Sequence, residues 1–199
     1  MTWKEFFVCC DQEVLKSRTR WRLLRLFKIR FYGSPNRQAV VMLRIAQLLQ
    51  GLDFAWLAEK SLNRLARRYG VHVGHFAQIG PGLKFPHPTS IVIGGGVKIG
   101  SNVRLFQQVT IGGAPRKNDN RIFRRGNNVT VYPGAKFVGN GCVGNNVLVG
   151  ANAVVTKPYG DNIVLAGVPA KVIRNLGDDD RAGSTAASMA RQLPDLFYE

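Results

Sequence analysis

Cysteine, acidic residues and long apolar segments are all scarce in this chain of 199 residues. The three cysteines are Cys9, Cys10 and Cys142, and an odd count with two adjacent members builds neither a disulfide framework nor a four-cysteine zinc site. No segment stays apolar over the ~18 residues that a membrane span needs. Glu5 and Asp11 interrupt the short apolar stretch at the N-terminus, which argues against a secretory signal. We therefore expect a cytoplasmic protein with reduced thiols.

The shortage of acid leaves a large positive charge, because 28 Lys and Arg face 12 Asp and Glu, for a net charge of +16. Residues 16–44 contain no acid at all, and a second basic cluster covers residues 116–125. Such fields attract polyanions, including the phosphates of a cofactor. Trp21, Phe27 and Phe31 are interleaved with the first cluster, so this segment suits either a packed helical cap or contact with an anionic membrane surface. No nucleic-acid recognition motif is present, and we predict no nucleic-acid partner.

The first 70 residues favour helices. A basic amphipathic helix is predicted over residues 20–31, and apolar residues recur at spacings of three and four over residues 36–68. Gly33, Ser34 and Pro35 separate the two stretches. Gly70 is a natural end to the second stretch, since glycine takes the left-handed conformation that follows many helices.

From Val73 onward the apolar pattern changes to a step of six residues. An aliphatic or aromatic side chain recurs at Val73, Ile79, Phe85, Ile93, Ile99, Leu105, Ile111, Val131, Phe137, Val143, Val149 and Val155. A six-residue unit makes one short strand and a turn, and three units close one triangular coil. We therefore predict a mainly β fold, a left-handed parallel β-helix of about four coils over residues 71–174. A helical region of residues 1–70 precedes it, and a tail of residues 175–199 follows.

Two breaks interrupt the step of six, and extra residues in such a fold must bulge outward at a corner. The short break, between Phe85 and Ile93, carries Pro86, His87 and Pro88. The long break, between Ile111 and Val131, contains the basic loop of residues 114–127. Because loops on a rigid scaffold are common binding sites, both breaks are candidate parts of a functional site.

Four segments resemble the serine acetyltransferase branch of the hexapeptide acyltransferases. They are residues 79–94 (IGPGLKFPHPTSIVIG), 105–113 (LFQQVTIGG), 150–157 (GANAVVTK) and 166–171 (AGVPAK). The resemblance implies a homotrimer with active sites between neighbouring prisms, which the helices can pair into a hexamer. It also implies acetyl-CoA bound along the coils and His87 as the base that deprotonates the acceptor hydroxyl.

The same resemblance suggests roles for further residues. Backbone N–H groups of Gly112 and Gly113 are expected near the reacting carbonyl. The later coils are expected to hold the coenzyme, through Ala135, Ala153, Lys157 and Lys171. The acceptor is expected beside them, in contact with Gln107 and Arg121. No metal is expected. The three histidines His72, His75 and His87 suffice in number for a zinc site such as that of β-helical carbonic anhydrases, but the motif after His87 does not match that family.

Some positions depart from the serine-using pattern. In an ungapped alignment, His72 replaces the Asp that precedes the catalytic histidine by one coil, and Ile122 replaces a second histidine. We therefore expect His72 to orient His87, and a saccharide hydroxyl of a surface polysaccharide to be the acceptor. Serine O-acetylation is the alternative, and a non-catalytic β-helix scaffold is a further one.

Overall fold

The computed structural model describes residues 1–15, 21–112 and 126–177. The N-terminal part is helical: α1 (Trp3–Cys10), a π-helical turn (Asp11–Leu15), α2 (Arg22–Tyr32), α3 (Pro35–Gly51) and α4 (Ala55–Tyr69). The stretch of helical periodicity over residues 36–68 forms two helices, because the chain turns at Leu52–Phe54, where Asp53 has φ 60°. Gly70 ends α4 in the left-handed conformation, as predicted (φ 63°).

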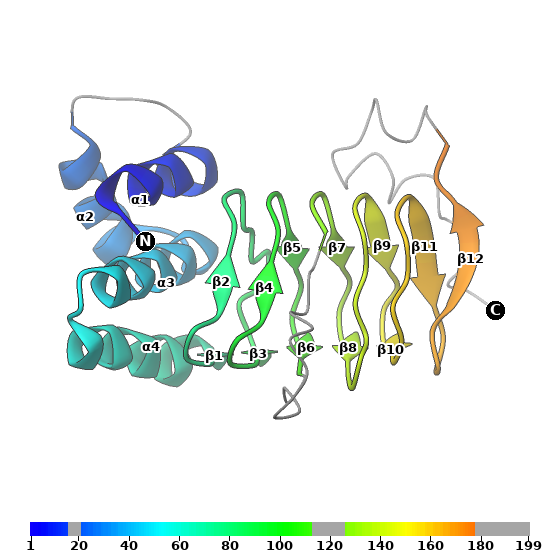
Figure 1. Ribbon diagram of the computed structural model, residues 1–199. Coiled ribbons are helices and arrows are strands. Elements are labelled where there is room, and N and C mark those ends of the chain that lie inside the picture. The colour runs from blue at the N-terminus through cyan, green and yellow to red at the C-terminus, as the bar shows by residue number, and fades with distance from the viewer. Residues whose placement is uncertain (16–20, 113–125, 178–199) are drawn as a thin grey trace.

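The rest of the described chain consists of short strands. They are β1 (Val71–Val73), β2 (Gln78–Ile79), β3 (Ile91–Ile93), β4 (Lys98–Ile99), β5 (Arg104–Leu105), β6 (Thr110–Ile111), β7 (Thr130–Val131), β8 (Lys136–Phe137), β9 (Val147–Val149), β10 (Val154–Val155), β11 (Ile163–Ala166) and β12 (Lys171–Asn175). Figure 1 shows them stacked in order beside the helices.

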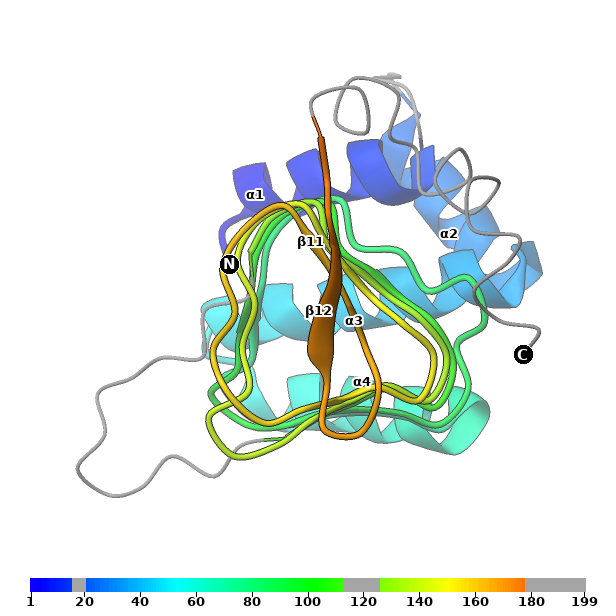
Figure 2. The same ribbon diagram turned by 90° about the vertical axis from the view of Figure 1, so that its right-hand side faces the viewer.

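Strands β1 to β11 lie on the three faces of a triangular prism, seen end-on in Figure 2. Face A stacks β1, β3, β6, β8 and β10, face B begins with β2 and β4, and face C stacks β5, β7, β9 and β11. Neighbouring strands within each face pair in parallel, so that Ile93 lies beside Ile111 and Ile111 beside Phe137. The predicted mainly β fold, a left-handed parallel β-helix of about four coils behind a helical region, is confirmed.

Each pair of faces meets at a corner. The A–B corners include residues 94–97 and 138–141, and the B–C corners include residues 100–102 and 144–146. The C–A corners include residues 86–90, 106–108 and 132–134. Residues that lie one coil apart at the same corner are therefore neighbours in space.

The prism interior is filled by the side chains of the six-residue repeat. From Ile79 to Val155, all eleven repeated positions are buried, and Val73 is partly buried against them. Apolar residues of the helices belong to the same cluster. The helical region and the β-helix therefore share one hydrophobic core.

Asparagines line the B–C corner. Asn102, Asn128, Asn146 and Asn162 all have φ between 55° and 59°. Their side-chain amides form a ladder, with Nδ2 of each donating to Oδ1 of the next at 3.2, 3.0 and 2.9 Å. Asparagine suits this corner because it tolerates the left-handed conformation and carries both a donor and an acceptor.

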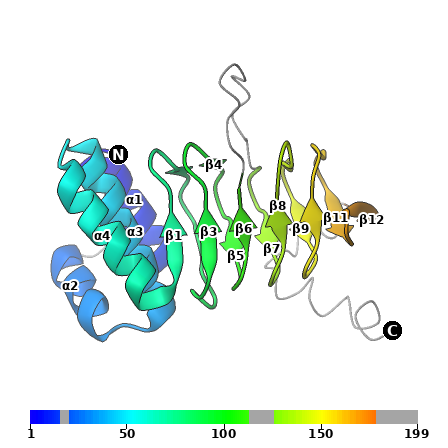
Figure 3. The same ribbon diagram turned by 90° about the horizontal axis from the view of Figure 1, so that it is seen from below.

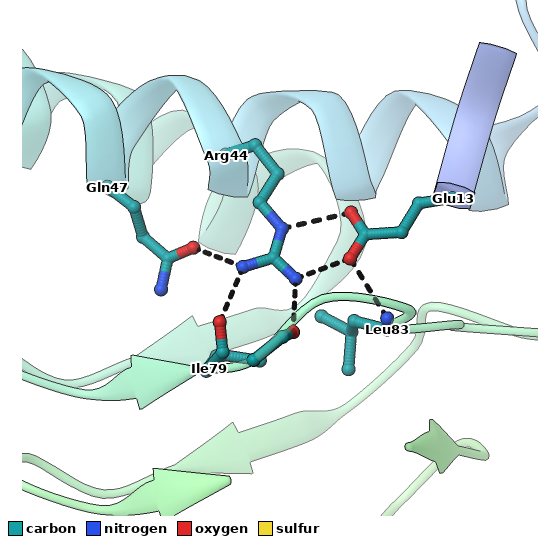
Figure 4. A network of polar contacts seen from close by, with 6 residues as sticks. Glu13, Arg44, Gln47, Ile79 and Leu83 are labelled. Atoms are coloured by element: carbon teal, nitrogen blue, oxygen red, sulfur yellow. Dashed lines mark hydrogen bonds and ion pairs between the residues drawn. The ribbon is translucent and has the colours of Figure 1, made fainter. Parts of the chain in front are cut away.

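A buried polar network joins the helices to the first coil (Figure 4). Arg44 of α3 donates to the carbonyl oxygens of Ile79 and Gly80, both at 2.7 Å. The Leu83 N–H donates to Glu13 of the π-helical turn at 2.9 Å. The helical region is thereby fixed to the coil that carries residues 79–90.

The last strand reverses the chain. β12 runs antiparallel to β11 on face C, with Lys171 opposite Ala166 and Asn175 opposite Ile163. It lies at the end of the prism opposite the helices (Figures 1 and 3). Among the described helices, none has the length and apolar character to cross a bilayer.

Candidate active site

His87 lies at the C–A corner of the first coil, in the short break of the repeat. Pro86 and Pro88 restrict the backbone on both sides. The Thr89 N–H donates to the His87 carbonyl at 2.8 Å, which closes the turn. Pro88 is buried and the His87 side chain is exposed. The corner therefore presents the imidazole to solvent on a rigid support.

Aromatic rings continue from His87 along the same corner. The His87 and Phe106 rings have centroids 6.4 Å apart, and Phe106 stacks on Tyr132 of the next coil at 5.4 Å. Burial raises the pKa of the Tyr132 hydroxyl, although the nearby Arg104 opposes that shift. Tyr132 is therefore a neutral phenol at physiological pH.

Two polar atoms at this corner are buried without a hydrogen-bond partner among the described residues: Gln107 Oε1 and the Tyr132 hydroxyl. Gln107 lies at the same corner as His87 but one coil further along the prism, as shown by the hydrogen bond that the Gln108 N–H donates to the Thr89 carbonyl at 3.0 Å. Since buried polar atoms are normally satisfied, this pair marks a place where a ligand can supply a partner.

A hollow of about 590 Å³ opens beside His87, between the corner and the helical region. Its wall consists of Pro35, Asn36, Arg68, Tyr69, Gly70, Pro86, His87, Pro88 and Thr89. Arg68 is the last cation of α4, and Tyr69 is held by a hydrogen bond from its hydroxyl to Gln38 Oε1 at 2.5 Å. The hollow thus combines an imidazole with a guanidinium, which suits a small acceptor that carries a hydroxyl and a negative group.

The other two histidines lie elsewhere. His72 is exposed on face A in β1, beside Val92 of β3, and it shares no hydrogen bond with His87 in the part of the chain that the structure describes. His75 is exposed at the A–B corner. Within residues 1–15, 21–112 and 126–177, no three His, Cys, Asp or Glu side chains gather into a possible metal site. The role of His72 in orienting His87 stays a prediction.

Comparison with known proteins identifies the fold and the chemistry together. The chain is 35% identical to a serine acetyltransferase of Helicobacter pylori over 163 residues, which span 81% of this chain and 91% of that protein. It superposes on a solved serine acetyltransferase in complex with CoA with a TM-score of 0.67, at 27% identity, covering 86% of this chain and 71% of the other. A soybean serine acetyltransferase complexed with serine has a TM-score of 0.60, at 26% identity, over 74% and 66% of the two chains. No family model matches the chain.

The chain belongs to the serine acetyltransferase family. It is therefore an acyltransferase that uses acetyl-CoA as co-substrate. The expectation of a saccharide acceptor in polysaccharide synthesis is wrong, because the relatives and the solved structures are serine acetyltransferases. That expectation was based on departures from the serine-using pattern, among them His72 and Ile122, and it gave them more weight than the resemblance over the rest of the chain.

In this member of the serine acetyltransferase family, the residues assigned to the coenzyme lie at several places on the prism. Ala135 and Ala153 are fully buried in its interior, so their side chains do not reach a ligand outside. The Gly112 N–H already donates to the Phe137 carbonyl at 3.0 Å. Lys157 lies at an A–B corner with its ammonium 5.5 Å from the centroid of the Tyr159 ring, and Lys171 begins β12. Gly113 and Arg121 lie outside the described residues.

The structure adds Arg68, Asn36 and Tyr132 to the candidate residues. Arg68 and Asn36 line the hollow beside His87, and Tyr132 stacks along the same corner. The basic run of residues 64–68 before Gly70 was the available signal for Arg68. Spacing along α4 does not say which of these arginines lines the hollow beside His87, because that depends on how the helix packs on the first coil.

Proposed function

We propose that this protein transfers the acetyl group of acetyl-CoA to the hydroxyl of L-serine. The observation that carries the proposal is the hollow lined by both His87 and Arg68, together with the unpartnered Gln107 Oε1 one coil further along the same corner. Serine has a group for each of these residues: a hydroxyl for His87, a carboxylate for Arg68 and an ammonium for Gln107. The names of the relatives, one of which was solved with serine, support the same acceptor.

In the proposed reaction, His87 accepts the proton of the serine hydroxyl as its oxygen attacks the thioester carbonyl. The new bond joins the serine oxygen to the acetyl carbon, and the bond from that carbon to the CoA sulfur breaks. The imidazolium then returns its proton to the thiolate. The products are O-acetylserine and free CoA, and His87 is again neutral.

Two further side chains are proposed to hold the acceptor. Arg68 pairs with the serine carboxylate, since a guanidinium and a carboxylate form strong charge-assisted hydrogen bonds. Gln107 Oε1 accepts a hydrogen bond from the ammonium, which satisfies a buried oxygen that otherwise has no partner in the described structure. The hydroxyl is then left to face His87.

We also keep the homotrimer, with its active sites between chains, as a proposal. His87 and Gln107 lie at C–A corners, whereas Gly112 and Lys157 lie at A–B corners. These are different edges of one prism. A neighbouring prism that brings its A–B corner to the C–A corner of the first would combine them, and the helices are proposed to pair such trimers into a hexamer.

The test is release of CoA thiol by the purified protein with L-serine as acceptor, beside a panel of sugars and acidic oligosaccharides. We expect turnover with L-serine alone and formation of O-acetylserine, detected by mass spectrometry. Coenzyme binding without turnover of L-serine, or turnover of a saccharide in its place, would overturn the proposed acceptor.

A further inference from the structure

Helix α2 is apolar on two opposite sides. Leu26 is buried and Ile29 is partly buried, and these two side chains attach the helix to the core. Leu24, Phe27 and Phe31 recur at spacings of three and four on the side away from Leu26, and they are 50–59% exposed. We call these three residues the outer face of α2.

The outer face is a continuous apolar surface. The Phe27 and Phe31 rings have centroids 4.7 Å apart. Trp21, Leu23 and Tyr32 border them and are 65–88% exposed. Figure 3 places α2 at the outer end of the helical region, away from the β-helix. Large exposed side chains that cluster in this way mark an interaction surface, whereas single ones do not.

Cations surround the outer face. Lys28 and Arg30 belong to α2, and the Arg30 guanidinium lies 5.4 Å from the centroid of the Phe31 ring. Burial, together with the charges of Arg64 and Arg68 on α4, lowers the pKa of Arg30. No acidic residue occurs between Trp21 and Gly51, the stretch that contains α2 and α3.

The positive charges around the outer face indicate which kind of partner it binds. If the outer face met its own copy across a two-fold axis, Lys28 and Arg30 would face cations of the same kind, and α2 has no carboxylate to separate them. A bilayer that contains anionic lipid supplies both an apolar interior and negative headgroups. Aromatic and aliphatic side chains flanked by Lys and Arg are the composition of helices that lie in that interface.

We propose that the outer face of α2 docks the protein on an anionic membrane surface, with Leu24, Phe27 and Phe31 inserted among the lipids and Lys28 and Arg30 at the headgroups. The contact is peripheral, in keeping with described helices that are unsuited to crossing a bilayer. This membrane contact does not depend on the identity of the acetyl acceptor, so the two proposals are tested independently.

The experiment is flotation of the full-length protein with vesicles of phosphatidylcholine, with or without phosphatidylglycerol. We expect binding only to the anionic vesicles, at a salt concentration of about 0.02 M, and release at about 0.5 M. The variant Leu24→Gln/Phe27→Gln is expected to reduce the partition coefficient about tenfold or more. The matched control Phe76→Gln removes an exposed ring from the β-helix and is expected to bind like the unmodified protein.

Because Leu24, Phe27 and Phe76 are exposed, circular dichroism and thiol release should be unchanged in Leu24→Gln/Phe27→Gln and in Phe76→Gln. A second variant, Lys28→Gln/Arg30→Gln, tests the charges separately and is expected to weaken binding at low salt. The proposal is overturned if the protein does not float with anionic vesicles, or if Leu24→Gln/Phe27→Gln floats as well as the control. A fall in molecular mass in that variant, without vesicle binding by the unmodified protein, would assign the surface to self-association instead.

Discussion

Arg44 and Glu13 form a two-pronged ion pair in which both side chains are fully buried. Arg44 Nε donates to Glu13 Oε2 at 2.9 Å, and Nη2 donates to Oε1 at 2.5 Å. The remaining N–H groups of Arg44 donate to Gln47, Ile79 and Gly80, so all five donors of the guanidinium are used. Burial acts to lower the pKa of Arg44, but the hydrogen bonds and charge of Glu13 outweigh it and raise that pKa.

The first prediction concerns this pair. Glu13→Gln leaves the Arg44 charge buried without a counter-ion, and we expect it to lower the free energy of unfolding by about 3–5 kcal/mol. Glu13→Leu/Arg44→Met removes the unpaired charge but also removes the side-chain partners of the Ile79 and Gly80 carbonyls and of the Leu83 N–H, so it is expected to recover only part of that loss. Urea unfolding at one fixed protein concentration measures both. Equal stability of Glu13→Gln and the unmodified protein would mean that the pair does not hold the helices to the first coil.

The second prediction concerns His87. His87→Ala removes the proposed base and is expected to lower kcat by about 10²- to 10⁴-fold, with the melting temperature unchanged. His75→Ala is the matched control, because His75 is also an exposed corner histidine, at the A–B corner of the same coil. Thiol release with saturating L-serine gives kcat for each. If both variants retain full activity, His87 is not the base.

The third prediction concerns the carboxylate of serine. Arg68→Met is expected to raise KM for L-serine about 10- to 100-fold while changing kcat little, because one charge-assisted contact is lost. Arg67→Met makes the same change on the neighbouring residue, which does not line the hollow beside His87, and should leave KM unaltered. L-Serinamide, which has no carboxylate, should be an equally poor acceptor for Arg68→Met and the unmodified protein. A strong preference of Arg68→Met for L-serine over the amide would contradict this role.

The fourth prediction concerns the thiols. Burial, reinforced by the charge of Glu13, raises the pKa of Cys10 from 9.0 to about 12, and burial also raises that of Cys9. Both should resist a disulfide reagent at pH 8 in the folded protein, while the half-buried Cys142 reacts. All three should react in denaturant.

The same shift has a consequence for stability. The folded Cys10 thiol keeps its proton at pH values where the unfolded thiol has lost it, so the folded state binds more protons. The free energy of unfolding should therefore fall as the pH rises above about 9. Cys10→Ala should flatten this slope. A slope that is identical in Cys10→Ala would assign it to another group.

The fifth prediction separates two contributions of the asparagine ladder. Asn146→Ala loses both side-chain hydrogen bonds and places alanine at φ 55°, and we expect a loss of about 2–4 kcal/mol. Asn146→Gly loses the hydrogen bonds but relieves the strain, so a loss of about 1–2 kcal/mol is expected. Thermal unfolding compares the two, with Asn63→Ala on the exposed side of α4 as the control. If glycine is as harmful as alanine, the backbone conformation contributes nothing.

Local patterns predicted the coil because each inward position depends only on its neighbours. The side chains of Ile99, Leu105 and Ile111 point inward because six residues complete one strand and one corner, wherever the unit lies in the chain. The position of His87 at an outer corner followed from the same count, since extra residues cannot enter the packed interior.

Relations between distant residues were not available from such patterns. Glu13 and Arg44 are 31 positions apart, and no periodicity joins them. The placement of Arg68 beside His87 depends on the angle at which α4 meets the first coil. The acceptor was predicted wrongly because single replacements at positions 72 and 122 were given more weight than the resemblance of the whole chain to serine acetyltransferases.

The antiparallel β12 has a consequence for how these molecules associate. The last coil of a stack of parallel strands has unpaired backbone N–H and C=O groups, so a strand of another molecule can pair with it and extend the stack. At one end of this prism the helices cover the first coil, and at the other β12 takes the pairing positions of β11 with the chain running in reverse. Copies of the protein are thereby kept from adding end to end into a filament. Strand pairing therefore cannot extend the assembly, which is left to contacts across the faces and corners or between helical regions, where it can close on itself.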